Sequence, residues 1–355
     1  MHLLLPAVAL LEVASSVFAA PAKGPRAIQR ELPDGLPKPS PSELSLIEQA
    51  ARGTLPNAPP PAVISNKGIT NLKLIAFNEL FEVAFFHELL TNVTENVDGY
   101  RFTDQADRDF VIGALKAILA QEELHALSAN NALVHFGQKP IEPCQYVVPV
   151  EDFDSAIALA STFTDVVLGT LQDAVERFAL GQDADLAREI ASVIGNEGEQ
   201  QGWFRVMQAR IPSALPFLTT SDLNFAFTAV RGFTVPGSCP NLDEIPLRTF
   251  EDLQILTKPT AESQNITLVF EDEDNEAEHL LWVTYVNQLN LPIVEPLHVT
   301  SKEGNLVEAT ALFPYNEHEL NGLTIAAVTK SDGPFDNVNS VAKWTLAGPG
   351  LIIVN

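Results

Sequence analysis

A carboxylate and an imidazole stand three residues apart inside an otherwise apolar helical pattern. Glu122 and His125, in the stretch QEELHAL, share one stripe with Leu115, Ile118 and Leu119. A carboxylate that faces a core is unfavourable unless a proton, a partner or a metal ion compensates its charge. Because Glu-x-x-His is a ligand pair of carboxylate metal sites in helical bundles, we interpret these two residues as a candidate metal-binding motif.

Polar residues interrupt the apolar stripes of three further predicted helices. The periodicity predicts helices over 70–93, 153–180 and 184–209. The polar residues near the middle of their inward faces are, in chain order, Glu79, Thr164, Glu197 and Gln200. Four helices with inward polar groups at similar depth predict a four-helix bundle that has a polar centre.

Several sequence blocks carry a family resemblance: NELFEVAFFHELL, AQEELHAL, TFTDVVLGTLQDA, NEGEQQGWFR and VPGSCP. Over roughly residues 70–210 the chain resembles the ferritin-like superfamily. More narrowly, it is similar to the secreted fungal ferritin-like proteins described as late-sexual-development or as starvation and stress-response proteins. The resemblance implies that Glu79, the Glu122 and His125 pair, and Glu197 occupy ligand positions on the first, second and fourth helices.

Two positions depart from the ligand pattern of the superfamily. Gln200 stands where a second histidine is expected, and Thr164 stands where a carboxylate of the third helix is expected. The remaining set suits one iron, manganese or zinc ion, and its members are Glu79, Glu122, His125 and Glu197. The alternative is a metal-free core whose carboxyl groups are partly protonated and hydrogen-bonded to Gln200, Thr164 and His125. The sequence leaves both interpretations open.

The N-terminal region predicts export. Residues 1–19 read as a signal peptide, with an apolar run too short for a membrane span and small residues before the cleavage point. A proline-rich flexible leader is expected over 20–68, with a short possible helix around 43–51. The mature protein is therefore expected to be secreted and extracellular, and could reside in the cell wall, with no membrane span. The formal net charge of −25 disfavours nucleic acid as a partner.

Two cysteines and two sequons agree with an exported protein. Cys144 and Cys239 are the only cysteines of the chain, and an even pair in an oxidising compartment predicts one disulfide. The triplets that start at Asn92 and Asn265 are candidate N-glycosylation sites of a glycoprotein.

The pattern changes after Cys239. Short β-branched and aromatic runs, separated by Gly, Asn, Asp and Pro, predict strands at 266–270, 280–286, 293–299, 306–313, 323–328 and 343–354. We therefore expect an α+β multidomain chain: a ferritin-like four-helix bundle over 69–238, a linker over 239–260 and a β-sandwich of immunoglobulin-like kind over 261–355.

No nucleotide-binding or hydrolase motif accompanies these elements. The sequence favours a non-enzymatic protein with a reduced metal site, and by resemblance a role in fungal sexual development or in the stress and starvation response. The first alternative is a secreted iron- or manganese-dependent oxidoreductase. The second is a structural cell-wall or spore-coat protein that binds wall polysaccharide through its β domain. The sequence gives no indication of the oligomeric state.

Overall fold

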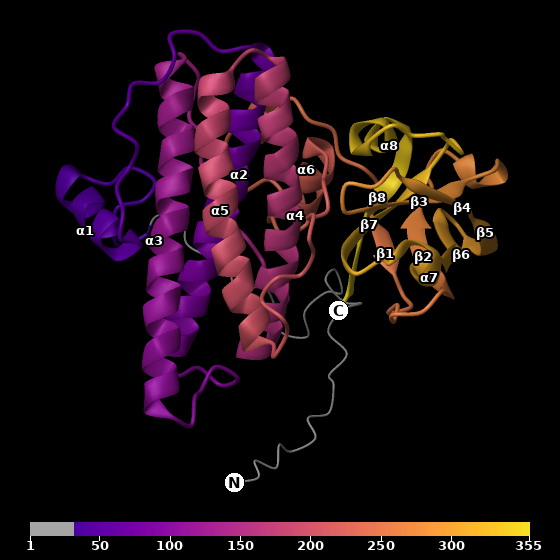
Figure 1. The fold of residues 1–355 in the computed structure, drawn as a ribbon, viewed down its shortest axis with the longest axis horizontal. Coiled ribbons are helices and arrows are strands. Elements are labelled where there is room, and N and C mark those ends of the chain that lie inside the picture. The colour runs from indigo at the N-terminus through magenta and orange to yellow at the C-terminus, as the bar shows by residue number, and fades with distance from the viewer. Residues whose placement is uncertain (1–31) are drawn as a thin grey trace.

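The computed structural model of the chain describes residues 32–355 and shows a helical bundle beside a β-sandwich (Figure 1). The predicted signal peptide and the first part of the predicted leader lie outside the described residues. The helices that build the bundle are α1 (Pro41–Ala51), α2 (Asn66–Thr94), α3 (Gln105–His135), α4 (Phe153–Leu180), α5 (Ala184–Met207) and α6 (Leu223–Arg231).

Four of these helices, α2 to α5, form the predicted bundle. The first three begin with side chains that accept hydrogen bonds from free backbone N–H groups: Ser65 caps α2, Asp104 caps α3, and Asp152 forms a capping box with Ser155 at α4. The predicted helix over 153–180 agrees with α4 at both ends. The helix predicted to end at Ala209 ends two residues earlier, and Ala209 itself has a positive φ of 57°.

Part of the predicted leader, from Leu32 to the end of α1, packs against the bundle. Pro41 is the first residue of α1, where its missing N–H is no loss, and Ser40 and Glu43 form a capping box there. Leu36 and Ile47 are buried in the same core as the bundle, and α1 packs against α3. The short helix expected around 43–51 is present as α1, whereas the expectation of flexibility is wrong for this packed stretch of the leader.

Eight strands make up the β part of the described chain: β1 (Leu253–Ile255), β2 (Gln264–Glu271), β3 (Trp282–Asn287), β4 (Ile293–Pro296), β5 (His298–Glu303), β6 (Leu306–Phe313), β7 (Gly322–Thr329) and β8 (Thr345–Val354). They form two antiparallel four-stranded sheets, in the orders β1-β2-β6-β5 and β4-β3-β7-β8. This is the strand pairing of immunoglobulin-like sandwiches. Strands β1, β2, β6 and β5 take the positions of A, B, E and D, and β3, β7 and β8 take those of C, F and G. The remaining strand, β4, extends the second sheet beside β3. The expected fold class is confirmed.

Three strand predictions need correction. The run expected over 293–299 is two strands, β4 and β5, and the chain changes sheets at Leu297 between them. Lys343, expected to open the last strand, belongs to α8 (Val338–Trp344). The expected linker over 239–260 contains β1, whose Leu253 and Ile255 face the sandwich core. A three-residue strand has too few alternations to be recognised from sequence.

The bundle and the sandwich share a hydrophobic core. In β7, Leu323, Ile325 and Ala327 belong to the core of the bundle, whereas Ala326 and Val328 belong to the core between the two sheets. The sheet that contains β7 is thus covered on both faces. On the bundle side, Gly169 of α4 lies against the backbone of Thr219, where any Cβ would collide with the carbonyl oxygen. Thr219 lies between α5 and α6 and donates a hydrogen bond to the Leu323 carbonyl of β7, so this close approach holds α4 near the sheet.

Two segments that lie far apart in the sequence are joined covalently. Cys144, in the segment between α3 and α4, forms a disulfide with Cys239, in the segment after α6. The predicted pairing is thus present. Glycosylation stays a prediction: Asn265 is exposed on β2, whereas Asn92 is half-buried in the last turn of α2.

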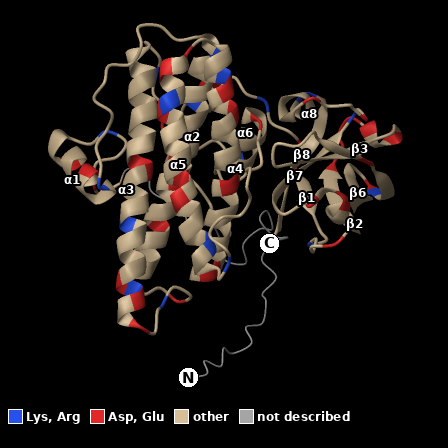
Figure 2. Cartoon of the chain, in the orientation of Figure 1, with Lys and Arg blue, Asp and Glu red and all other residues tan. Residues whose placement is uncertain are grey.

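The charges of the described chain are spread over both parts. Acidic residues lie on the helices and on the sheets, with fewer Lys and Arg among them (Figure 2). Within residues 32–355, no helix combines the length and the apolar character that crossing a membrane requires.

Candidate metal centre

The side chains of three helices meet in the middle of the bundle. Glu79 comes from α2, Glu122 and His125 come from α3, and Glu197 comes from α5, and each offers a ligand atom within 4.8 Å of the others. The three carboxyl groups are fully buried, and the side chain of His125 is 14% exposed. The four residues that the sequence proposed as ligands are therefore brought together by the fold.

The imidazole of His125 lies between the three carboxyl groups. Its Nδ1 is 2.9 Å from Glu122 Oε2, 3.6 Å from Glu79 Oε2 and 3.9 Å from Glu197 Oε1. Only the first of these distances is a hydrogen bond. In the described chain, neither Lys nor Arg forms an ion pair with any of the three glutamates. One imidazolium can balance only one of the three negative charges.

Several buried oxygen atoms of the cluster have no hydrogen-bond donor. Both carboxyl oxygens of Glu79 and both of Glu197 are buried without a hydrogen-bond partner. A buried polar group without a partner costs about 1–3 kcal/mol, and more when it is charged. Glu79 and Glu197 each place one carboxyl oxygen in the group of mutually close ligand atoms, and such unpartnered oxygens fit a cation that would supply the missing positive charge.

The sequence interpretation missed a fourth buried carboxyl group, that of Glu82. It lies one turn beyond Glu79 on α2, is fully buried, and has one oxygen without a partner. Its other oxygen accepts a 2.7 Å hydrogen bond from Nδ2 of Asn78. One signal in the sequence could have revealed Glu82. It follows Glu79 by three residues, which is the same spacing as that of Glu122 and His125. Every residue from 71 to 86 of α2 is buried, so no polar face set the phase of this helix.

Gln200 and Thr164, the two positions that depart from the ligand pattern, have different surroundings in the structure. Gln200 donates a hydrogen bond from Nε2 to Glu122 Oε1, on the side away from His125. Thr164 is fully buried, and its hydroxyl has no partner, as the predicted inward phase of α4 requires. The neighbouring Asp165 is also buried but interacts with Gln201 and the arginines of α5 and the loop after it. It therefore does not replace the missing carboxylate.

Burial and mutual repulsion set the protonation of the centre. Burial, joined by repulsion among the glutamates, raises the pKa of Glu82 and Glu197 well above the usual value of 4.5. Burial also raises the pKa of Glu79, to about 7, although His125 opposes the shift. At Glu122 burial acts in the same direction, but the ion pair and hydrogen bond with His125 outweigh it and lower the pKa. Without a metal ion, protons therefore compensate most of the charge.

We expect the metal-free protein to become more stable as the pH is lowered from 8 to 5. A carboxyl group whose pKa is higher in the folded than in the unfolded chain contributes stability that is complete below about 4.5 and is lost as the pH rises through the folded pKa. Glu79, Glu82 and Glu197 all act in this sense. Thermal unfolding of the chelated full chain at several pH values measures the effect. A melting temperature that rises from pH 5 to pH 8 would contradict it.

Replacing Glu197 with Gln is expected to stabilise the metal-free protein at pH 8, by about 1–2 kcal/mol. The amide has nearly the shape of the carboxyl group but brings hydrogen-bond donors into a cluster of acceptors. The same variant should hold metal more weakly, because it removes an anionic ligand. Denaturant unfolding of the chelated protein measures the first effect. The matched control is Glu199→Gln, which changes an exposed residue of the same helix.

Aromatic rings close the site on one side. Phe86, one turn after Glu82, stacks on Phe204, one turn after Gln200, with ring centroids 5.7 Å apart and an interplanar angle of 11°. Both rings are fully buried. They keep water from the cluster at this level of the bundle and strengthen the electrostatic interactions inside it.

Comparison with known proteins supports the identity of the bundle. Residues 70–210 match the family model of the ferritin-like domain, and these residues contain all four members of the cluster. The chain thus carries a ferritin-like domain followed by two antiparallel sheets. A comparison with curated proteins finds no match.

Proposed function

We propose that this protein binds a single first-row transition metal ion, iron, manganese or zinc, in the centre of its ferritin-like domain. The observation that carries the proposal is the set of buried carboxyl oxygens of Glu79 and Glu197 that have no hydrogen-bond donor. The ligands would be Glu79, Glu122, His125 and Glu197. Three oxygen ligands and one nitrogen ligand suit these metals.

A single ion accounts better for the donor set than a pair of ions. Two ions in such a bundle share four carboxylates and two imidazoles. Here Gln200 and Thr164 supply an amide and a hydroxyl in place of an imidazole and a carboxylate. Glu82 adds a carboxyl group, but it lies outside the group of four mutually close ligands and is bonded to Asn78. A bound iron or manganese ion would supply redox chemistry, and a zinc ion would not.

The residues of the chain itself prepare the site for a cation. Gln200 holds one oxygen of Glu122, and His125 holds the other, so the orientation of this carboxylate is fixed from both sides. Glu79 and Glu197 keep their oxygens free for a ligand. His125 must be neutral to bind a metal ion through a ring nitrogen, and the metal affinity therefore increases with pH.

Elemental analysis of the full chain, purified without chelator, tests the proposal. After incubation with iron, manganese or zinc and removal of the excess, about one ion per chain is expected. Chelation should lower the melting temperature only modestly, because the helices keep their apolar core without metal. The proposal fails if no ion is retained above the level of a protein that lacks the cluster.

The same purified protein distinguishes metal binding without catalysis from the two alternative functions. A secreted iron- or manganese-dependent oxidoreductase would consume dioxygen or peroxide when loaded with metal, whereas a metal-binding protein without catalysis would not. A structural protein of the cell wall or spore coat would co-sediment with chitin or glucan whatever its metal content. The observation that favours metal binding over the purely structural role is the buried cluster, because a wall-binding β domain does not require it.

We further propose that the protein is exported by a fungus and acts in sexual development or in the response to stress or starvation. The N-terminal sequence and the paired cysteines support export, and the resemblance of the sequence blocks supports the biological setting. Expression of the full chain in a secretory host tests export. Mass spectrometry should find the mature N-terminus after Ala19, and an uncleaved chain retained in the cell would contradict it.

A further inference from the structure

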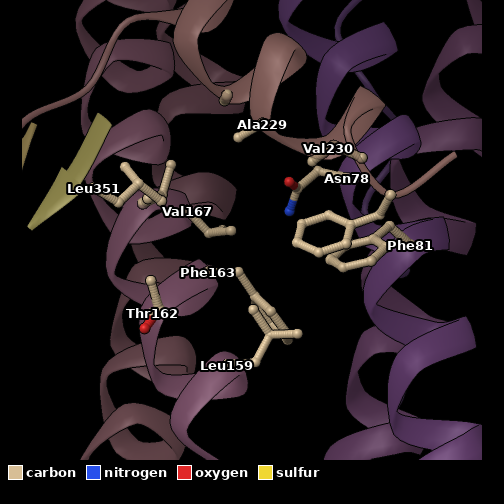
Figure 3. Close-up of a pocket in the computed structure, with 12 residues that line it drawn as sticks. Asn78, Phe81, Leu159, Thr162, Phe163, Val167, Ala229, Val230 and Leu351 are labelled. Atoms are coloured by element: carbon tan, nitrogen blue, oxygen red, sulfur yellow. The ribbon is translucent and has the colours of Figure 1, made fainter. Parts of the chain in front are cut away.

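Amide side chains donate hydrogen bonds to two of the buried glutamates. Asn78 donates to Glu82, and it does so at the edge of a small pocket that is lined mostly by apolar side chains such as Phe81 (Figure 3). Gln200 donates to Glu122. Of these two glutamates, Glu122 belongs to the group of four mutually close ligands, so the orientation of the Gln200 amide bears directly on the centre.

The amide nitrogen of Gln200 faces three oxygen atoms. Its Nε2 donates to Oε1 of Glu122, and it lies 3.3 Å from Oε1 of Gln121 and 3.4 Å from Oδ1 of Asn196. If the amide turned around, its carbonyl oxygen would meet these oxygen atoms with no proton between them. Because an unsatisfied acceptor that is buried is unfavourable, the nitrogen stays on this side.

Two groups that can only accept hydrogen bonds fix the direction of this chain of amides. At one end, Gln121 donates from Nε2 to the backbone carbonyl of Ala51, the last residue of α1, at 3.4 Å. Its Oε1 is thereby left to accept from Gln200. At the other end stands the carboxylate of Glu122. Neither a backbone carbonyl nor a carboxylate can donate, so neither glutamine can reverse without losing a hydrogen bond.

The carbonyl oxygen of Gln200 is left without a donor. Gln200 is 4% exposed, and its Oε1 is buried with no hydrogen-bond partner, as are the carboxyl oxygens of Glu79 and Glu197. A carbonyl oxygen is a neutral ligand that suits manganese, whereas the imidazole expected at this position suits zinc and iron. Zinc is usually bound by four ligands in a tetrahedral arrangement, and octahedral oxygen sites are typical of manganese.

We propose that Gln200 sets the metal specificity of the centre by offering Oε1 as a fifth, neutral ligand, and that Gln121 is the residue that positions it. This inference rests on the proposed function, which supplies the other four ligands. A fifth oxygen strengthens the binding of manganese and adds little for zinc, because zinc is satisfied by four ligands. The preference between the two metals thus depends on Gln121, which lies outside the ligand group.

Competition between manganese and zinc for the full chain tests the proposal. Gln121→Met keeps the length of the side chain but removes both amide contacts, so the Gln200 amide is free to turn. Manganese retention is expected to fall about 10-fold, while zinc retention stays unchanged. Gln200→Met, which removes Oε1 itself, should have the same effect. Elemental analysis after dialysis against a mixture of the two metals gives the ratio, and circular dichroism verifies that each variant is folded.

A rescue variant and a control complete the comparison. Gln121→Glu keeps an oxygen that accepts from Gln200 and should keep the wild-type ratio of manganese to zinc. Gln172→Met makes the matched change at a half-buried glutamine of α4, whose amide donates to a carbonyl of its own helix, and should alter neither metal.

Equal losses of manganese and zinc in Gln121→Met, or an unchanged ratio in Gln200→Met, would overturn the proposal. If one of these two variants does not fold, the other decides. Wild-type protein that retains both metals while the ratio ignores these substitutions refutes this inference alone. Wild-type protein that retains neither metal refutes the proposed function, and this inference with it.

Discussion

Replacing His125 with Ala is expected to reduce retention of iron, manganese or zinc by at least about 100-fold, which corresponds to about 2.7 kcal/mol. His125 is the only nitrogen ligand of the cluster, and its ring lies within 4 Å of all three carboxyl groups. Elemental analysis after incubation with each metal measures the loss. The matched control is His135→Ala, which removes an exposed imidazole from the same helix.

The same substitution separates metal binding from folding. Without metal, loss of His125 leaves the Glu122 carboxylate buried beside Glu79 and Glu197, and the removal of one partner of a buried ion pair costs about 3–5 kcal/mol. Circular dichroism of the variant therefore accompanies the metal analysis. Added imidazole should restore part of the metal content if the cavity left by the ring remains open. Unchanged metal content in a folded variant would show that the ion is held elsewhere.

Reduction of the disulfide is expected to lower the free energy of unfolding by roughly 4–5 kcal/mol. Cys144 and Cys239 are 95 residues apart, and the loop that they close contains α4, α5 and α6. An open loop of this length gains much conformational entropy in the unfolded chain. Denaturant unfolding of the oxidised and the reduced wild-type protein gives the comparison without any substitution.

A second measurement verifies the premise of that comparison. Thiol titration of the unfolded, unreduced protein should find no free thiol. Two free thiols would show that the bond does not form in solution. If the bond forms but reduction leaves stability unchanged, the loop must be held in the unfolded state by other contacts.

Local sequence was sufficient to recognise the bundle and most of its centre. In α3, α4 and α5 one side of the helix faces the core and another faces water, so apolar residues recur with the period of the helix. The polar residues that interrupt this period therefore identify the inward positions. Glu122, His125 and Glu197 were recognised in this way and lie together in the centre, and Thr164 is fully buried.

The same reasoning could not recognise Glu82. The α2 helix is surrounded by other elements along 71–86, and a helix that is buried on every side has no polar face to set its phase. Glu79 and Glu82 are both buried, but only Glu79 fell on the apolar stripe that Val83 and Phe86 suggested.

The residues of this chain determined by themselves the long helices and most of the strands, because periodicity and capping act over a few neighbours, whereas short elements such as β1 and α8 left no such pattern. Only the tertiary structure decided how those segments combine. It placed β4 and β5 in different sheets, and it covered β7 with two cores, one on each face. It also placed β8 against the bundle. Such pairings depend on burial between distant segments, and a distant partner leaves no periodic trace in the local sequence.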